Sequence, residues 1–117
     1  LGVEAPVSIL SACLLGRGTG AVEVRHTVDL VARTGRDWKA GQALTITDHH
    51  HHEVAGLDPL LLSAAPATAT NPLPYYMAVG GTLTQDVPAG TVITRAMVEA
   101  PKESVLWKLR NEMDAAA

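Results

Sequence analysis

Hydrophobic positions follow a helical spacing at the two ends of this chain and the spacing of short strands between them. At the start, residues 3–15 are apolar at most positions, and Pro6 suits a first helical turn because its missing N–H has no bond to make there. We predict a helix over residues 3–15 that ends at Gly16. A helix that is apolar on nearly all sides is expected to be buried against another surface.

The middle of the chain indicates short extended segments. Residues 28–31 are mostly β-branched or apolar and predict a strand, and residues 43–47 predict a second one. Three consecutive leucines at positions 60–62 are interpreted as either a short buried strand or a helical turn. The pattern therefore favours several short strands between the two helical ends.

The last part of the chain indicates two helical segments. Thr94 is a candidate N-cap for a short helical turn that reaches residue 98, and Pro101 stops this turn. Ser104 is then expected to cap a final helix. The apolar face of that helix is predicted to consist of Val105, Leu106, Leu109 and Met113.

One motif occurs twice, in residues 36–45 and 85–94, at a constant offset of 49 positions. Both copies read polar, Asp, apolar, any residue, Ala-Gly, polar, two apolar residues and Thr, which predicts an internal repeat. Each copy is typical of a strand, a tight turn and a second strand, because Gly41 and Gly90 can adopt the positive φ of a turn corner. Asp86 is expected to bond nearby backbone N–H groups, so we interpret it as a turn-maker rather than a catalytic group.

Composition narrows the function classes. The 117 residues are one domain's worth of chain, and an apolar fraction of 47% without any Phe predicts an aliphatic core. A net charge of −3 offers no basic surface for nucleic acid, and no apolar run is long enough to span a membrane. The single cysteine, Cys13, excludes an intrachain disulfide, which agrees with a reducing compartment. We therefore expect a cytoplasmic protein that binds neither nucleic acid nor membranes.

Four consecutive histidines, His49 to His52, are candidates for a metal site. In a strand, alternate side chains share a face, so either His49 and His51 or His50 and His52 would converge. Two imidazoles and a carboxylate can bind zinc or nickel, and we name His50 and His52 as the candidate ligands. A structural zinc site, however, uses four ligands at loop-forming spacings, and the only further histidine is His26. The alternatives are a solvated loop that takes up metal adventitiously and a pH-sensitive or anion-binding loop. His49 and His51 are further candidates for contacts with a ligand or a partner.

Residues 71–77 form the most aromatic stretch of the chain. Tyr75 and Tyr76 either cover the edge of the core or turn their hydroxyls toward a ligand or a partner domain. The sequence contains no Gly-rich dinucleotide motif after a strand, no P-loop, no Ser-His-Asp arrangement and no spaced pair of catalytic carboxylates. We therefore assign no catalytic and no cofactor-binding residue in this chain.

The two motif copies resemble the SAF domain, a β-clip module related to type III antifreeze proteins. In that family a strand leads into an Asp-apolar-Pro-Ala-Gly turn, which two apolar residues, a Thr and a short helix follow. Residues 86–99 match this pattern closely, and residues 37–45 match it more loosely. The resemblance implies a mainly β fold with short helices, namely a β-clip of short twisted strands flanked by an N-terminal helix and a C-terminal helix.

The flanking sequences extend the resemblance. Residues 1–9 and 106–113 are similar to the C-terminal part of bacterial oxidoreductases that combine a homoserine-dehydrogenase-like NAD(P)-binding domain, a catalytic domain and a C-terminal SAF domain. One branch of that group resembles an alternative 1-deoxy-D-xylulose 5-phosphate reductoisomerase. The resemblance implies that residues 1–20 are a helix of an upstream catalytic region, and that residues 21–117 are the SAF-like domain with its C-terminal helix.

By this resemblance, the chain is an accessory domain of a cytoplasmic NAD(P)-dependent oxidoreductase and is not catalytic alone. NAD(P) is the expected cofactor of the parent enzyme, and the expected partners are the upstream catalytic domain and further copies in a homo-oligomer. In sialic acid synthases the SAF domain of one subunit caps the active site of its partner, so capping and oligomerisation are both implied roles. The alternatives are a free-standing sugar-acid or polyol-binding module that uses Tyr75 and Tyr76, and a metal-binding module that uses residues 49–52.

Overall fold

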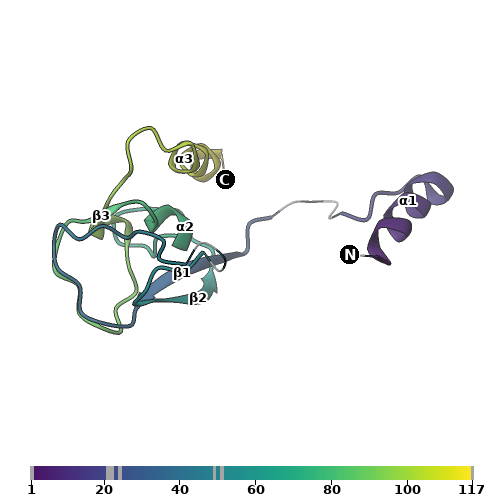
Figure 1. Ribbon diagram of the computed structural model, residues 1–117. Helices are drawn as coiled ribbons and strands as arrows, with labels where there is room; N and C mark the ends of the chain where they lie inside the picture. The colour runs from purple at the N-terminus through teal and green to yellow at the C-terminus, as the bar shows by residue number, and fades with distance from the viewer. Residues whose placement is uncertain (1, 21–22, 24, 49, 51, 117) are drawn as a thin grey trace.

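The computed structural model describes residues 2–20, 23, 25–48, 50 and 52–116 of the chain. Over these residues the fold combines helices with two small antiparallel sheets, β1 with β2 and β3 with β4 (Figure 1). α1 lies apart from both sheets, whereas α3 lies against the body that contains them. In chain order, the elements are α1 (Glu4–Leu15), β1 (Val28–Thr34), β2 (Leu57–Ser63), α2 (Tyr75–Ala78), β3 (Thr82–Leu83), the 3-10 helix η1 (Arg95–Met97), β4 (Val98–Glu99) and α3 (Val105–Ala116).

The longer sheet joins β1 to β2 in a register that places Val31 opposite Leu60. This pairing confirms the strand predicted at residues 28–31, and it decides the alternatives for residues 60–62 in favour of a strand. The strand is not buried as predicted, because Leu61 is exposed. Val31 and its neighbour Ala32 are both fully buried. Because adjacent strand residues point to opposite faces, the middle of β1 is covered on both sides.

The strand predicted over residues 43–47 is wrong. Within this fully described segment, Ala43 is the one residue in a β-bridge, and its partner is Thr82. The Leu44 N–H also donates to the Gly81 carbonyl at 2.9 Å. The segment meets the edge of β3 over this short distance only, so its apolar alternation reflects burial of Leu44 rather than a continuous ladder.

The two motif copies pair with each other around a local pseudo-twofold axis. Trp38 and Val87 are equivalent positions of the two copies, and they exchange backbone N–H···O bonds of 2.9 Å in both directions. Gly41 and Gly90 both have a φ of 81°, as the turn prediction required. The backbone hydrogen bonds around these glycines come in pairs that the repeat offset relates. The Gly41 N–H donates to Leu83 O, and the Gly90 N–H donates to Thr34 O; the Leu83 N–H donates to Gln42 O, and the Thr34 N–H donates to Thr91 O. In the third pair, the Leu44 N–H donates to Gly81 O and the Ile93 N–H donates to Ala32 O. The internal repeat is therefore a structural duplication.

One largely aliphatic core joins the two halves, as the composition predicted. Trp38 is buried within it, donates its indole N–H to the Gly56 carbonyl at 3.2 Å, and carries the Arg36 guanidinium 3.9 Å above its ring centre. The fully buried apolar side chains come from β1, from both motif copies and from the segment between them: Val31, Leu44, Leu73, Met77, Leu83, Val87 and Ile93.

α3 packs on this body through Trp107 and Arg110, which are its buried residues. The Trp107 indole N–H donates to a backbone carbonyl of α2 at 2.8 Å. Ser104 precedes the helix, as predicted, and its hydroxyl accepts the Trp107 N–H at 3.5 Å. The short helical turn expected near residue 98 is present as η1. The predicted apolar face of α3 is wrong as a packing face, because its side chains are between 41% and 68% exposed: Val105, Leu106, Leu109 and Met113.

α1 confirms the helix predicted over residues 3–15. It ends at Gly16, whose φ is 62° and whose N–H donates to the Ala12 carbonyl at 3.2 Å. The large apolar side chains at and near this helix are between 52% and 78% exposed: Val3, Val7, Ile9, Leu10, Leu14 and Leu15. The part of the chain that the structure describes therefore does not provide the burial expected for α1. No helix in that part is long and apolar enough to cross a membrane.

Candidate functional site

A buried ion pair fixes α3 to the sheet. The Arg110 guanidinium donates to both carboxylate oxygens of Asp29, at 2.8 Å to Oδ1 and 2.9 Å to Oδ2. Strand β1 places Asp29 on the side that faces α3, and both side chains are less than a tenth exposed. A bidentate pair of this kind fixes orientation as well as distance, because the planar guanidinium matches the planar carboxylate. The site therefore begins with a rigid joint between β1 and α3.

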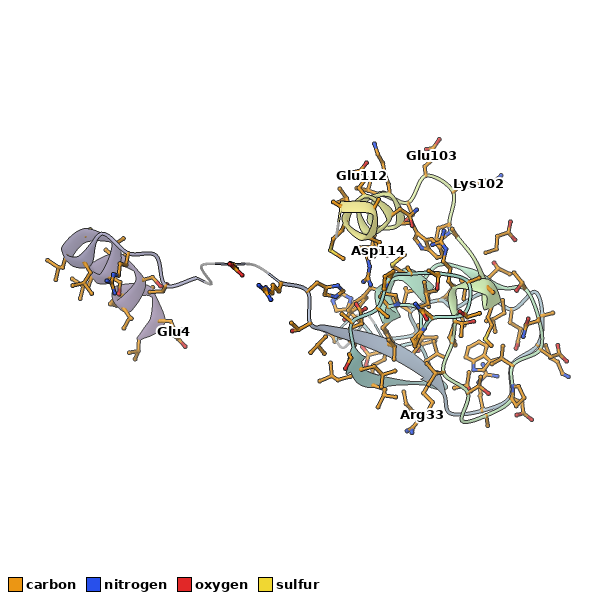
Figure 2. All side chains as sticks on the ribbon, turned by 180° about the vertical axis from the view of Figure 1, so that it is seen from behind. Glu4, Arg33, Lys102, Glu103, Glu112 and Asp114 are labelled. Carbon is orange, nitrogen blue, oxygen red and sulfur yellow. The ribbon has the colours of Figure 1, made fainter. Side chains whose placement is uncertain are left out.

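Three further groups complete the hydrogen bonding of this pair. Arg110 Nε donates to Asp114 Oδ1 at 2.8 Å, and Nη2 donates to the Ala65 carbonyl at 2.7 Å. His26 Nε2 lies 2.9 Å from Asp29 Oδ1. Asp114 lies on the side of α3 that faces the sheets, whereas Glu112 points away from them (Figure 2). The cluster thus ties α3, β1 and the segment after β2 together.

The electrostatics of the pair favour its charged form. Hydrogen bonds from Arg110 hold the pKa of Asp29 below its ordinary value of 3.8, and this effect outweighs the opposing effect of burial. The same bonds raise the pKa of Arg110. A buried carboxylate with a lowered pKa is an acceptor held in place, so Asp29 is suited to structure and not to proton transfer near neutral pH.

A cleft opens beside this cluster, with a cavity volume of about 560 Å³. It lies between the segment that leads into β1, the segment after β2 and the C-terminal end of α3. Its lining combines small apolar side chains with basic groups at the rim: Arg25, His26, Ala64, Ala65, Pro66, Met113, Asp114 and Ala116. The lining offers apolar contact, and the Arg25 guanidinium beside it donates to Glu23 Oε2 at 2.6 Å.

The second polar site lies where the motif copies cross. Asp86 Oδ1 accepts the Ala40 N–H at 2.9 Å, and Asp37 Oδ1 accepts the Ala89 N–H at 2.8 Å. Each Asp therefore caps the turn of the other copy. Lys39 Nζ lies 2.7 Å from Asp86 Oδ2. The hydrogen bond from Lys39, together with the one from the Ala40 N–H, lowers the pKa of Asp86. Asp86 therefore accepts a backbone N–H in a turn, but the prediction that this N–H lies near it in the sequence is wrong, because the turn belongs to the opposite copy.

The histidine run is described in part. His50 and His52 lie in turns rather than in a strand, so strand alternation does not bring them together. The His50 N–H donates to Asp48 Oδ1 at 2.8 Å, and His52 has a φ of 55°. His49 and His51 lie outside the described residues. Among the residues that are described, no group of three or more His, Cys, Asp or Glu side chains is placed to hold a metal ion. The metal site at His50 and His52 stays a prediction.

The two tyrosines have different environments. Tyr75 is 4% exposed, and its hydroxyl accepts the Val54 N–H at 3.1 Å inside the core. Its ring meets that of Tyr76 edge to face, with ring centres 5.5 Å apart. Tyr76 is exposed, so it is the ring of this pair that is open to a ligand or a partner.

Sequence reasoning did not identify the cluster of Asp29, Arg110 and His26. A signal was present, because Asp29 is an acidic residue among the apolar residues at the start of β1, and Arg110 follows Trp107 by three positions on the same helix. A charged residue at a position that the periodicity marks as buried indicates a partner of opposite charge elsewhere in the chain. The partner itself is not visible in the sequence, since the two residues are 81 positions apart.

Comparison with models of known protein families found no match to this chain, and a search of the curated proteins found none either. The likeness to the SAF domain therefore depends on the doubled motif itself. The geometry adds that the two copies are equivalent in space and that each Asp caps the turn of the other copy.

Proposed function

We propose that this chain is a C-terminal accessory SAF domain with a β-clip fold, belonging to a cytoplasmic, homoserine-dehydrogenase-like NAD(P)-dependent oxidoreductase. The observation that carries this proposal is the crossing of the two turns, in which Asp37 and Asp86 exchange backbone partners. Two turns that cap each other in this way support a clip built from short extended segments. The motif residues serve that fold, so the domain is not catalytic alone.

The cofactor of the parent enzyme is not expected to bind to this chain. A dinucleotide pyrophosphate binds where a Gly-rich turn opens a helix, because the free N–H groups and the positive end of the helix dipole face the phosphates there. The glycines from Gly16 to Gly20 follow the C-terminal end of α1, and the Gly16 N–H is already bonded to Ala12. These residues do not fit the cofactor, and NAD(P) belongs to the proposed upstream domain.

The proposed role is to cap a neighbouring active site or to hold an oligomer together. Two features support a role in docking. The Asp29–Arg110 pair fixes α3 rigidly, and the cleft beside it presents apolar and basic groups on an open surface. A rigid helix next to a shallow binding surface suits contact with another protein unit.

The test uses the full-length parent enzyme and a version that ends at residue 20 of this chain. We expect the shortened enzyme to contain fewer protomers per oligomer by light scattering, or to lose at least about tenfold in kcat/KM for NAD(P)H-dependent turnover, which corresponds to one missing transition-state contact. A shortened enzyme with the same number of protomers and the same kinetics would show that the domain neither caps nor assembles the enzyme.

A further inference from the structure

Two apolar helices of this chain lack a covering surface. α1 exposes apolar side chains around most of its axis, and none of its described residues is buried. α3 packs through Trp107 and Arg110 on one side and exposes Leu106, Leu109 and Met113 on the other. The exposed residues of α3 are three and four positions apart, so they form one continuous stripe along the helix.

The stripe on α3 continues into the cleft described above. Met113 belongs to both, because it is exposed on α3 and also lines the cleft next to Ala64, Pro66 and Ala116. Stripe and cleft together form one apolar surface that runs along the helix and onto the body. We call this surface the α3 face.

We propose that the α1 helix and the α3 face are the dimer interface between two copies of this chain, with two α1 and two α3 helices packed as a four-helix arrangement around a twofold axis. This inference deepens the assembly role proposed above and rests on it. The helix α1 decides in favour of a second copy. It is apolar on every side except the narrow face that carries Glu4, Ser8 and Ser11, so the α3 face of its own chain would cover only part of the apolar surface, whereas a second α1 and a second α3 cover the rest.

The available apolar area is more than half of what a stable dimer buries. Full burial of an aliphatic side chain removes on the order of 60–120 Å² of apolar surface. The six apolar side chains at α1 and the four on α3 are a little over half exposed on average, so together they supply roughly 400–700 Å² per protomer. A standard stable interface buries about 800 Å² per partner, and the Ala and Pro residues of the cleft supply part of the remainder.

The charge pattern also fits contact between copies. α1 carries a single charged residue, Glu4, at its first turn. Two α1 helices that meet across a twofold axis therefore bring no run of like charges together. A twofold axis also closes the assembly, because each copy uses the same pair of surfaces and none remains open for a third copy.

The test measures the mass of the 117-residue chain by light scattering over a range of concentrations. Leu10→Lys alters α1, and Leu109→Lys alters the α3 face. Leu61→Lys is the matched control, because Leu61 is as exposed as these two leucines but lies on β2. Cys13 on α1 is exposed and is the only cysteine, so a spin label on it reports the distance between copies without any further substitution.

We expect a mass of twice 12.3 kDa for the unaltered chain and for Leu61→Lys. Each of the other two variants removes two buried leucines per dimer, so we expect Kd to rise at least about a hundredfold and the dipolar coupling between labels to disappear. A chain that is monomeric at all concentrations overturns the proposal. This includes a monomer in which the spin label is immobilised because α1 packs on the α3 of its own chain. A dimer that neither variant weakens also overturns it.

The outcomes separate this inference from the proposed function. If the chain is a monomer but the shortened parent enzyme loses activity, the dimer interface is wrong and the accessory role stands. If the chain dimerises through these helices but the shortened parent is unchanged in protomer number and kinetics, the interface stands and the accessory role is wrong.

Discussion

The buried pair between Asp29 and Arg110 yields the sharpest prediction about stability. Replacing Arg110 with Met keeps most of the side-chain volume and removes four hydrogen bonds, two of them to Asp29. The Asp29 carboxylate then stays buried without its main cation. Breaking a buried pair by removing one partner costs about 3–5 kcal/mol. With a slope of about 1–3 kcal/mol per molar urea, we expect Arg110→Met to lower the urea midpoint by at least about 1 M.

The control and the assay use the same helix. Lys108→Met removes a charge from an exposed position of α3 and is expected to change stability by less than about 0.5 kcal/mol. Unfolding is followed by circular dichroism and by tryptophan fluorescence, since Trp107 loses its packing when α3 detaches. The double variant Asp29→Leu/Arg110→Met removes both charges and is expected to recover most of the loss. If Arg110→Met is as stable as Lys108→Met, the pair does not hold α3 and the reasoning is wrong.

Three further predictions follow from the described contacts. The folded pKa of Asp29 is lowered, so the stability that its carboxylate contributes is complete above the unfolded pKa of about 4 and is lost as pH falls through the folded pKa. The difference in unfolding free energy between the unaltered chain and Asp29→Asn should therefore shrink between pH 5 and pH 2. A difference that stays constant over this range would contradict the prediction. Gly90→Val places a β-branched residue at a φ of 81°, where nothing lies within 4 Å of its Cβ. Backbone strain alone should therefore lower the free energy of unfolding in urea by about 1–3 kcal/mol, and Gly90→Asn should lower it by less. Equal losses of stability in the two variants would count against the turn. Asp37→Ala and Asp86→Ala should lower the melting temperature in calorimetry by similar amounts, because each removes one carboxylate cap from the opposite turn; an effect of only one of them would argue against the pseudo-twofold exchange.

The turns were predictable from the sequence because glycine chemistry is local. A positive φ at Gly41 and Gly90 follows from the residues beside them, and both turns are present. The pairing of the two copies was not predictable, because a repeat offset shows which residues are equivalent but not that they bond to each other. The strand predicted over residues 43–47 failed for a related reason, since apolar alternation reports burial and says nothing about a backbone partner.

The packing of α3 shows the limit of periodicity. The spacing of Leu106, Leu109 and Met113 correctly marks an apolar stripe, but the helix packs on the side that holds Trp107 and Arg110. A buried arginine is favourable only when an acidic side chain pairs with it. The partner here, Asp29, lies at the other end of the domain sequence, so the sequence around α3 does not reveal it. Because that partner is distant in sequence, the sequence indicated residues 49–52 and the tyrosines as candidate sites. It did not indicate the cluster that holds α3, β1 and the segment after β2 together.

The crossing of the two turns has a consequence for how this domain forms. Neither turn can satisfy its N–H groups with its own Asp, so half of the domain, made alone, lacks the caps that hold its corner. The two halves must therefore fold in a single step that closes a loop of about fifty residues, which makes folding slow for a domain of this size. Once formed, the halves hold each other without the connecting chain, so a protease cut between β2 and α2 should leave two fragments that stay together and unfold as one.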